Sequence, residues 1–140
     1  MANTYTELFY HFIWSTKGRE PAITPEVEAA VHGYIRVRCQ EMKVMVHALN
    51  GTEDHTHLVV TLPPDLSIAD FLEKIKGASS HFINRLPDRV ERFYWQEGYG
   101  ALTFAKRDLP RIVAYVQNQK QHHRDGTLSA KMERGSDDAP

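Results

Sequence analysis

The stretch KVMVHALNGTEDHTHLVVTL, residues 43–62, decides the fold. Two runs rich in apolar and β-branched residues, 43–50 and 55–62, flank the four residues GTED, whose composition is typical of a hairpin turn. The two runs are therefore expected to be neighbouring antiparallel strands. Pro63 and Pro64 end the second run, because proline cannot donate a hydrogen bond to a sheet.

Upstream of this hairpin, the sequence predicts a strand and a helix. The aromatic and β-branched run 5–15 is typical of a buried strand. Thr24 is a suitable N-cap with Pro25 at the first helical position, and apolar residues recur at helical spacing to about Cys39. Cys39 is the only cysteine, so it has no disulfide partner within the chain and is interpreted as a core residue.

Downstream of the hairpin, the sequence predicts two more helices and one more strand. Segment 67–86 begins with a serine N-cap and carries an apolar stripe at helical spacing. The aromatic run 93–104 predicts a strand interrupted by two glycines, and a last helix is expected over about 108–123. The predicted fold class is therefore α+β: a ferredoxin-like βαββαβ domain with a four-stranded antiparallel sheet and an added C-terminal helix.

The length of 140 residues suits a single domain, which is expected over residues 1–124. Residues 125–140 are polar and are predicted to form a flexible tail. The formal net charge is -1, so any basic surface must come from local clustering of lysine and arginine. Because the sequence shows neither a membrane-spanning apolar run nor a signal peptide, we expect a cytoplasmic protein without a membrane partner.

Two histidines at the start of the second hairpin strand are candidate metal ligands. Residues two apart on a strand point to the same face, so His55 and His57 can reach one cation. Neutral imidazole suits divalent transition metals. The spacing alone is weak evidence, because two histidines this close also occur by chance.

The last predicted helix carries a second group of polar side chains. Tyr115 and Gln119 are four residues apart and share a face, and His122 lies on the adjoining ridge. An aromatic residue beside an apolar stripe is usually the edge of a core, so this group alone favours a packing role. Its occurrence together with the paired histidines on a βαββαβ frame points instead to a shared site.

Five segments form a specific combination in this order: HFIWSTKGREPAI (11–23), DHTHLVV (54–60), IKGASSHFIN (75–84), WQEGYGA (95–101) and YVQNQKQHHR (115–124). Together they resemble the single-tyrosine HUH transposases of the insertion sequence 200/605 family, including the transposases associated with repetitive extragenic palindromes. The tail DGTLSAKMERGSDDAP departs from the usual C-terminal continuation of that family.

The resemblance implies a metal-dependent reaction on single-stranded DNA. It makes Tyr115 the nucleophile, and it makes His55, His57 and Gln119 the ligands of a divalent metal, Mg²⁺ or Mn²⁺. The implied reaction is cleavage and rejoining of single-stranded DNA through a 5'-phosphotyrosine intermediate. The implied partners are hairpin-forming element ends and a second copy of the chain in a homodimer.

Basic residues within the region that the resemblance covers, about residues 5–124, are the expected DNA contacts. These candidates are Lys17, Arg19, Lys76 and Arg107, with His122 as a further one. Two alternatives remain open from the residues themselves. One is a non-enzymatic single-stranded nucleic-acid-binding module of ferredoxin-like fold, and the other is a metal-dependent phosphoesterase acting on small phosphoesters.

Overall fold

The computed structural model describes residues 3–135, and residues 1–2 and 136–140 lie outside the described part of the chain. The helices and strands are β1 (Phe9–Ser15), α1 (Pro25–Glu41), β2 (Met45–Gly51), β3 (His55–Thr61), α2 (Ile68–Asn84), β4 (Gly100–Thr103), α3 (Leu109–Gln117) and α4 (Gln119–Asp125). Three short 3-10 turns are η1 (Lys17–Arg19), η2 (Lys106–Asp108) and η3 (Lys131–Glu133). This order confirms the predicted α+β, ferredoxin-like βαββαβ domain with an added C-terminal helical part.

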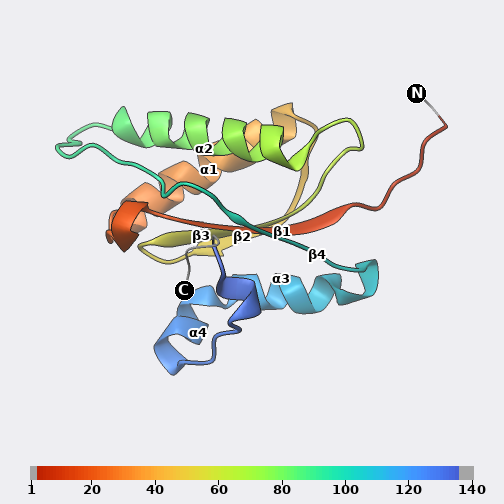
Figure 1. The fold of residues 1–140 in the computed structure, drawn as a ribbon. Coiled ribbons are helices and arrows are strands. Elements are labelled where there is room, and N and C mark those ends of the chain that lie inside the picture. Colours follow the sequence, from red (N-terminus) through yellow and green to blue (C-terminus); the bar gives the residue numbers. More distant parts are fainter. Residues whose placement is uncertain (1–2, 136–140) are drawn as a thin grey trace.

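The four strands form one sheet in the order β2-β3-β1-β4, and every neighbouring pair is antiparallel. The predicted hairpin is confirmed, with Asn50 of β2 opposite His57 of β3. Figure 1 shows α1 and α2 on one face of this sheet and α3 and α4 on the other. The central strands β3 and β1 are therefore covered on both faces, which is why β3 is buried along nearly its whole length.

Alternate residues of the central strands feed two separate cores. On the side of α1 and α2, Trp14 and Leu58 pack with Phe71 in the larger core. On the other side, Val59 packs with Val116 of α3 in a smaller core. Cys39 lies fully buried in the larger core, as predicted. Within the described ranges, no helix is long and apolar enough to cross a membrane.

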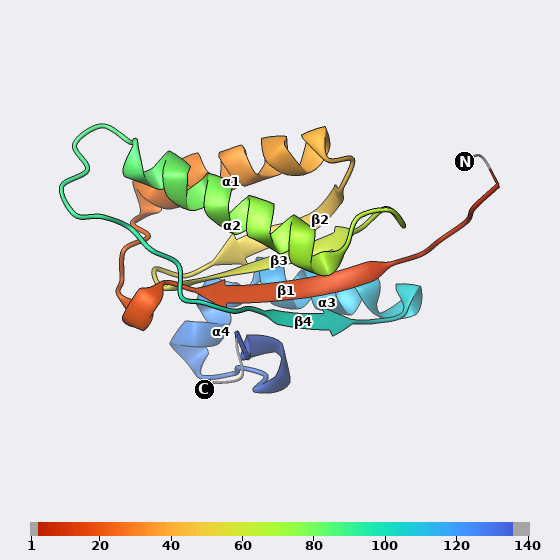
Figure 2. The same ribbon diagram turned by 45° about the horizontal axis from the view of Figure 1, so that its top comes forward.

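The strand predicted over 93–104 is shorter than expected. Only Gly100–Thr103 forms β4, and Trp95 makes an isolated bridge with Thr16. The preceding residues are held by side chains of α2: the Asn84 amide pairs with both backbone groups of Phe93, and the Lys76 ammonium donates to the carbonyls of Gln96 and Gly98 at 2.8 and 2.6 Å. Figure 2 shows this segment leaving α2 as a wide loop before it joins the sheet edge.

The single helix predicted over 108–123 is in fact two helices that meet at Asn118. The side-chain amide of Asn50 donates to the carbonyls of Val116 and Gln117, at 3.1 and 3.0 Å. The Asn118 amide donates to the carbonyl of Ala114 at 2.8 Å. These side-chain donors satisfy carbonyls at the end of α3, so the chain can turn there and start α4 in a new direction.

Candidate active site

His55 and His57 lie side by side on the face of the sheet that α3 and α4 cover. Both side chains are buried, with 2% and 0% of their residue surface exposed, and their ring centroids are 5.0 Å apart. The two-residue spacing on β3 brings the rings to one face, as predicted.

The C-terminal helices bring Tyr115 and Gln119 to the same place in the same chain. Gln119 is fully buried, and its Oε1 lies 3.0 Å from the Nε2 of His55. The Tyr115 ring lies 6.3 Å from the His57 ring, centroid to centroid. The four residues that the resemblance assigns to the nucleophile and the metal ligands thus converge, although about sixty residues separate the strand from the helices.

Glu133, in the segment predicted to be a flexible tail, also reaches this group. Its Oε1 lies 3.2 Å from the Nε2 of His57 and 3.3 Å from the Nε2 of His55, and the ligand atoms of these three residues are all within 4.8 Å of one another. Its Oε2 accepts hydrogen bonds from the Gln119 amide, at 2.8 Å, and from the Tyr115 hydroxyl. No local pattern marks Glu133, because an acidic residue in a polar tail is usually solvated.

The tail from Asp125 onward is described only as far as Gly135. Over that part it returns to the sheet, as Figure 1 shows, and the backbone N–H of Ser129 donates to the Tyr115 hydroxyl at 3.0 Å. Tyr115, a member of the smaller core, is only 8% exposed. Residues 136–140 of the predicted tail lie outside the described residues, and the flexibility of the tail stays a prediction.

His123 is a further neighbour of the group, one helical turn after Gln119. Its Nε2 lies 3.0 Å from the Gln119 Oε1, 3.2 Å from the His55 Nε2 and 3.6 Å from the Glu133 Oε1. The spacing of four residues from Gln119 is the sequence signal that would have found it.

Each strand histidine also has a partner on its outer nitrogen. The Nδ1 of His55 lies 2.8 Å from Asp54 and 2.9 Å from the hydroxyl of Thr52. The Nδ1 of His57 lies 2.8 Å from the Nε2 of His11, a fully buried residue of β1. Neither outer contact was predicted from the sequence, and the contact with His11 depends on the register of β1 and β3.

The electrostatics of the site are dominated by burial and by Glu133. Burial opposes protonation of His55, but its hydrogen bonds to Asp54 and Glu133 outweigh burial and raise the pKa of His55 to about 9. Burial lowers the pKa of His57. Burial and then the Glu133 carboxylate raise the pKa of Tyr115 to about 12.

The neighbours of Glu133 and His11 shift these two groups in turn. Burial alone would raise the pKa of Glu133, but the bonds from His55 and His57 hold it well below its usual range. Burial, aided by His57, lowers the pKa of His11 to about 3, so His11 is neutral. Without a metal, the site is therefore an ion pair between protonated His55 and ionised Glu133 beside neutral histidines.

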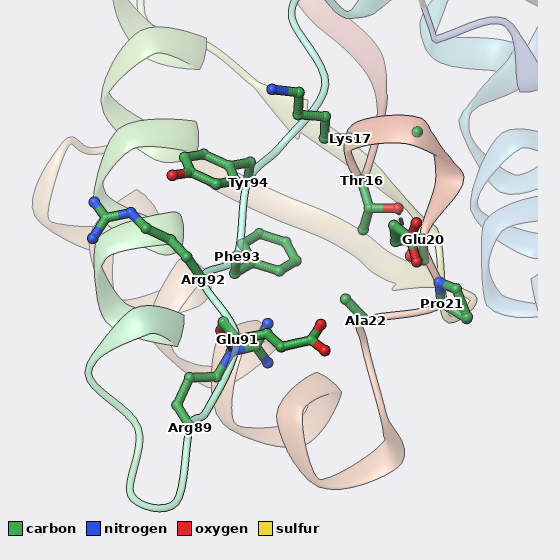
Figure 3. A pocket seen from close by; sticks show the side chains of 11 residues that line it. Thr16, Lys17, Glu20, Pro21, Ala22, Arg89, Glu91, Arg92, Phe93 and Tyr94 are labelled. Atoms are coloured by element: carbon green, nitrogen blue, oxygen red, sulfur yellow. Dashed lines mark hydrogen bonds between the residues drawn. The ribbon is translucent and has the colours of Figure 1, made fainter.

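Lys17 and Arg19 lie in η1, which follows β1 at the end of the sheet that bears His55. The backbone N–H of Thr16 donates to the Asp54 carbonyl at 2.8 Å, and the Arg19 guanidinium is 3.7 Å from the Asp54 carboxylate. Figure 3 shows the neighbouring pocket between this turn and residues 89–94. On its rim, the Lys17 ammonium lies 5.3 Å from the ring centroid of Tyr94, which is 51% exposed.

The other three predicted DNA contacts lie elsewhere or are engaged. Lys76 is bonded to two carbonyls of the loop before β4. Arg107, in exposed η2, follows the end of β4 that pairs with the start of β1, away from His55. The His122 ring stacks on Tyr115, with centroids 4.5 Å apart, and its Nδ1 lies 2.9 Å from the hydroxyl of Thr127.

Known proteins resemble this chain in both sequence and fold. The family model "Transposase IS200 like" matches residues 4–119. The ISDra2 transposase TnpA of Deinococcus radiodurans is 27% identical over 118 residues, covering 81% of this chain and 84% of its own. The transposase for insertion sequence element IS200 of Salmonella typhimurium is 26% identical over 131 residues, covering 90% of this chain and 86% of its own.

Two solved structures are similar as well. A crystal structure from Deinococcus radiodurans R1, described as that of a transposase, has a TM-score of 0.67 and 26% identity, and the match covers 85% of this chain and 95% of that one. A REP-associated tyrosine transposase bound to a REP hairpin has a TM-score of 0.66 over 91% of this chain and 74% of its own, and at 15% identity it supports the fold alone. The family match spans the segments that hold His55, His57, Tyr115 and Gln119 and favours a DNA transposase over the two alternatives. The chain therefore belongs to the IS200-like transposase family and is a DNA transposase, an enzyme that cleaves DNA.

Proposed function

We propose that this transposase cleaves and rejoins single-stranded DNA through a covalent bond between Tyr115 and a 5'-phosphate. The observation that carries the proposal is the convergence of one phenol, two imidazoles and one amide oxygen, from Tyr115, His55, His57 and Gln119, on one face of the sheet. A phenol is a poor nucleophile at neutral pH, so its attack requires neutralisation of the negative charge on the phosphate. A cation held by the neighbouring imidazoles and amide can provide this neutralisation.

The side chains present fit a divalent metal ion. The Nε2 of His55, the Oε1 of Gln119 and the Nε2 of His123 are 3.0 to 3.2 Å from one another. Neighbouring ligands of an octahedral ion bound at about 2.1 Å are about 3 Å apart. We propose that His55, His57 and Gln119 hold Mg²⁺ or Mn²⁺, with His123 and Glu133 close enough to join them. Because imidazole suits Mn²⁺ better than Mg²⁺, Mn²⁺ is expected to bind more tightly.

The proposed cleavage is balanced at the phosphate. The Tyr115 oxygen gives up its proton and forms a bond to phosphorus, the bond from phosphorus to the 3'-oxygen breaks, and that oxygen takes a proton to become a free 3'-OH. The bound ion would neutralise charge on the attacked phosphate and on the leaving oxygen. Attack by a 3'-OH on the phosphotyrosine reverses the step and joins DNA without a high-energy cofactor.

Access to the Tyr115 oxygen requires the tail to move. Glu133 and the Ser129 N–H both bond to the hydroxyl, and Tyr115 is 8% exposed. A phosphate is also repelled by the Glu133 carboxylate. The segment carrying Ser129 and Glu133 is therefore proposed to shift when DNA binds, in keeping with its predicted flexibility.

We propose hairpin-forming single-stranded DNA as the substrate, because the resemblance to the insertion sequence 200/605 family implies it, and a structural neighbour of the same fold was solved with a REP hairpin. Lys17 and Arg19 are the proposed phosphate contacts nearest the site, since η1 adjoins Asp54. The exposed Tyr94 ring beside Lys17 can stack on an unpaired base. Lys76, Arg107 and His122 stay candidate DNA contacts.

We also retain the homodimer as a proposal. In the single chain described here Tyr115 lies beside the histidines of the same subunit, and in a dimer the second copy would serve to hold the other DNA end. Light scattering of the purified protein with and without hairpin DNA tests the assembly.

The decisive experiment is a search for the covalent adduct. The full chain is incubated with Mn²⁺ and hairpin-bearing single-stranded DNA from the flanks of its own locus, and the products are separated on a denaturing gel. We expect a protein-DNA band that Tyr115→Phe abolishes and that Tyr5→Phe, a change at a residue that is 80% exposed, leaves in place. Absence of the band in the unmodified protein, or its survival in Tyr115→Phe, would overturn the proposal.

A further inference from the structure

His11 occupies a place in the sheet where an apolar residue would be expected. It lies on β1 between Phe9 and Ile13 on the face toward α3, and it is fully buried. Its Nε2 lies 2.8 Å from the Nδ1 of His57 on the neighbouring strand, and the ring centroids are 5.1 Å apart. A buried imidazole is costly unless it is hydrogen-bonded, so this contact is the feature that needs an explanation.

The rest of the His11 ring makes no polar contact. Within residues 3–135, its Nδ1 has no hydrogen-bond partner. A phenylalanine could fill a similar volume without leaving a buried polar atom unpaired. Among the described residues, the only hydrogen-bond partner of the His11 side chain is therefore His57.

The contact couples the position of the His57 proton to the position of the His11 proton. Two neutral imidazoles at this distance share one hydrogen bond, in which one ring donates and the other accepts. His57 can bind a cation through Nε2 only if its proton lies on Nδ1, and that proton is then donated to the Nε2 of His11. If His57 instead donates from Nε2 to Glu133, which lies 3.2 Å away, its Nδ1 can accept from His11.

The outer partner of His55 is of a different kind. Its Nδ1 faces the carboxylate of Asp54 at 2.8 Å, and an ionised carboxylate only accepts, so the His55 Nδ1 always carries a proton. An imidazole can both donate and accept. The His11 ring can therefore keep His57 bonded both in the metal-free state, with Glu133 as acceptor, and in the ligand state.

We propose that His11 is a positioning residue for His57, which orients the His57 ring and accepts its Nδ1 proton in the tautomer whose Nε2 lone pair is free for the metal site. The inference rests on the proposed metal site and adds an outer partner to it. Outer partners of metal-bound histidines change metal affinity by about 10- to 100-fold when removed.

The test compares two substitutions at His11 in the full chain by Mn²⁺ binding, measured from the electron paramagnetic resonance signal of free Mn²⁺. His11→Phe keeps the volume and removes the hydrogen bond, and we expect about 10- to 100-fold weaker binding. His11→Gln carries an amide that both donates and accepts near the position of the imidazole Nε2, and we expect binding within a few-fold of the unmodified protein. Thermal unfolding in a chelator checks that both variants are folded.

Several outcomes overturn the inference in distinguishable ways. Equal Mn²⁺ affinity in folded His11→Phe and the unmodified protein removes the role of His11 but leaves the metal site intact. Equal loss in His11→Phe and His11→Gln means that the ring shape, not the hydrogen bond, supports His57. Absence of Mn²⁺ binding in the unmodified protein, or binding that survives His57→Ala, defeats the proposed metal site and this inference with it.

A second measurement needs no variant. In nitrogen-15 NMR spectra of the unmodified protein with diamagnetic Zn²⁺, we expect the imidazole proton of both His57 and His11 on Nδ1. A proton on the His11 Nε2 in the metal-loaded protein contradicts the proposal.

Discussion

The Tyr115 hydroxyl donates a hydrogen bond to the carboxylate of Glu133, a residue of the C-terminal segment that follows α4. The other carboxylate oxygen of Glu133 faces His55 and His57. A single side chain thus joins the proposed nucleophile to the proposed metal ligands. Substitution of Glu133 is expected to affect both Tyr115 and the metal ligands, and the two effects can be measured separately.

Removing the charge of Glu133 should make Tyr115 more acidic. Burial and the carboxylate raise the pKa of Tyr115 to about 12, so in Glu133→Gln we expect this pKa to move back toward 10, the ordinary value for tyrosine. Carbon-13 NMR of labelled tyrosine follows the titration. Asp125→Asn, an exposed change in the same part of the chain, should leave the pKa unmoved, and an unmoved pKa in Glu133→Gln would contradict the prediction.

Metal binding should strengthen with pH up to about 9. The folded pKa of His55 is raised from 6.5 to about 9, so His55 is protonated at neutral pH, and a metal ion must displace that proton. Mn²⁺ affinity should therefore rise about tenfold per pH unit from about pH 7 to pH 9 and then level off. In the metal-free protein the stabilisation from protonated His55 is complete below about pH 6.5 and is lost as the pH rises through 9.

Asp54→Asn is the matched variant for this pH dependence. It removes the carboxylate at the Nδ1 of His55, and this change lowers the pKa of His55. The Mn²⁺ affinity should therefore stop rising at a lower pH than in the unmodified protein. A metal affinity that is flat from pH 7 to pH 9 would rule out protonated His55 as the competitor.

His123 should contribute to metal affinity. Its Nε2 is 3.2 Å from the His55 Nε2 and 3.0 Å from the Gln119 Oε1, within reach of the same ion. His123→Ala is expected to weaken Mn²⁺ binding by about tenfold, or about 1.4 kcal/mol. Calorimetric titration measures this change, and Gln121→Ala, an exposed position of the same helix, serves as the control. Identical affinities in the two variants would place His123 outside the metal site.

Asn50 should stabilise the turn between α3 and α4. Its amide donates to the carbonyls of Val116 and Gln117 at the end of α3. Asn50→Ala is expected to lower the free energy of unfolding by about 1–2 kcal/mol, measured by urea denaturation, because these bonds are lost. Gln117→Ala, an exposed change at the same turn, should cost less than half as much. Equal costs would show that Asn50 does not hold the turn.

Local patterns predicted most of the fold. The hairpin around Gly51–Asp54, the two long helices with their Thr24 and Ser67 caps, and the order of the strands all follow from side-chain periodicity and turn chemistry. The errors lie where distant side chains replace local hydrogen bonds: Lys76 and Asn84 hold the loop that looked like a strand, and Asn50 ends α3 within what looked like one helix. Hydrogen bonds from distant side chains leave no periodic pattern in the sequence of the segment whose structure they change.

By itself, the sequence determined which residues could share a face: His55 with His57 through the period of a strand, and Tyr115 with Gln119 through the period of a helix. Only the tertiary structure decided that the two faces meet within one chain, because α3 packs back across β2 and β3. It also decided that His11, His123 and Glu133 join them. These three residues lie on another strand, the next helical turn and the tail, and their contacts depend on strand register and helix direction rather than on any local pattern.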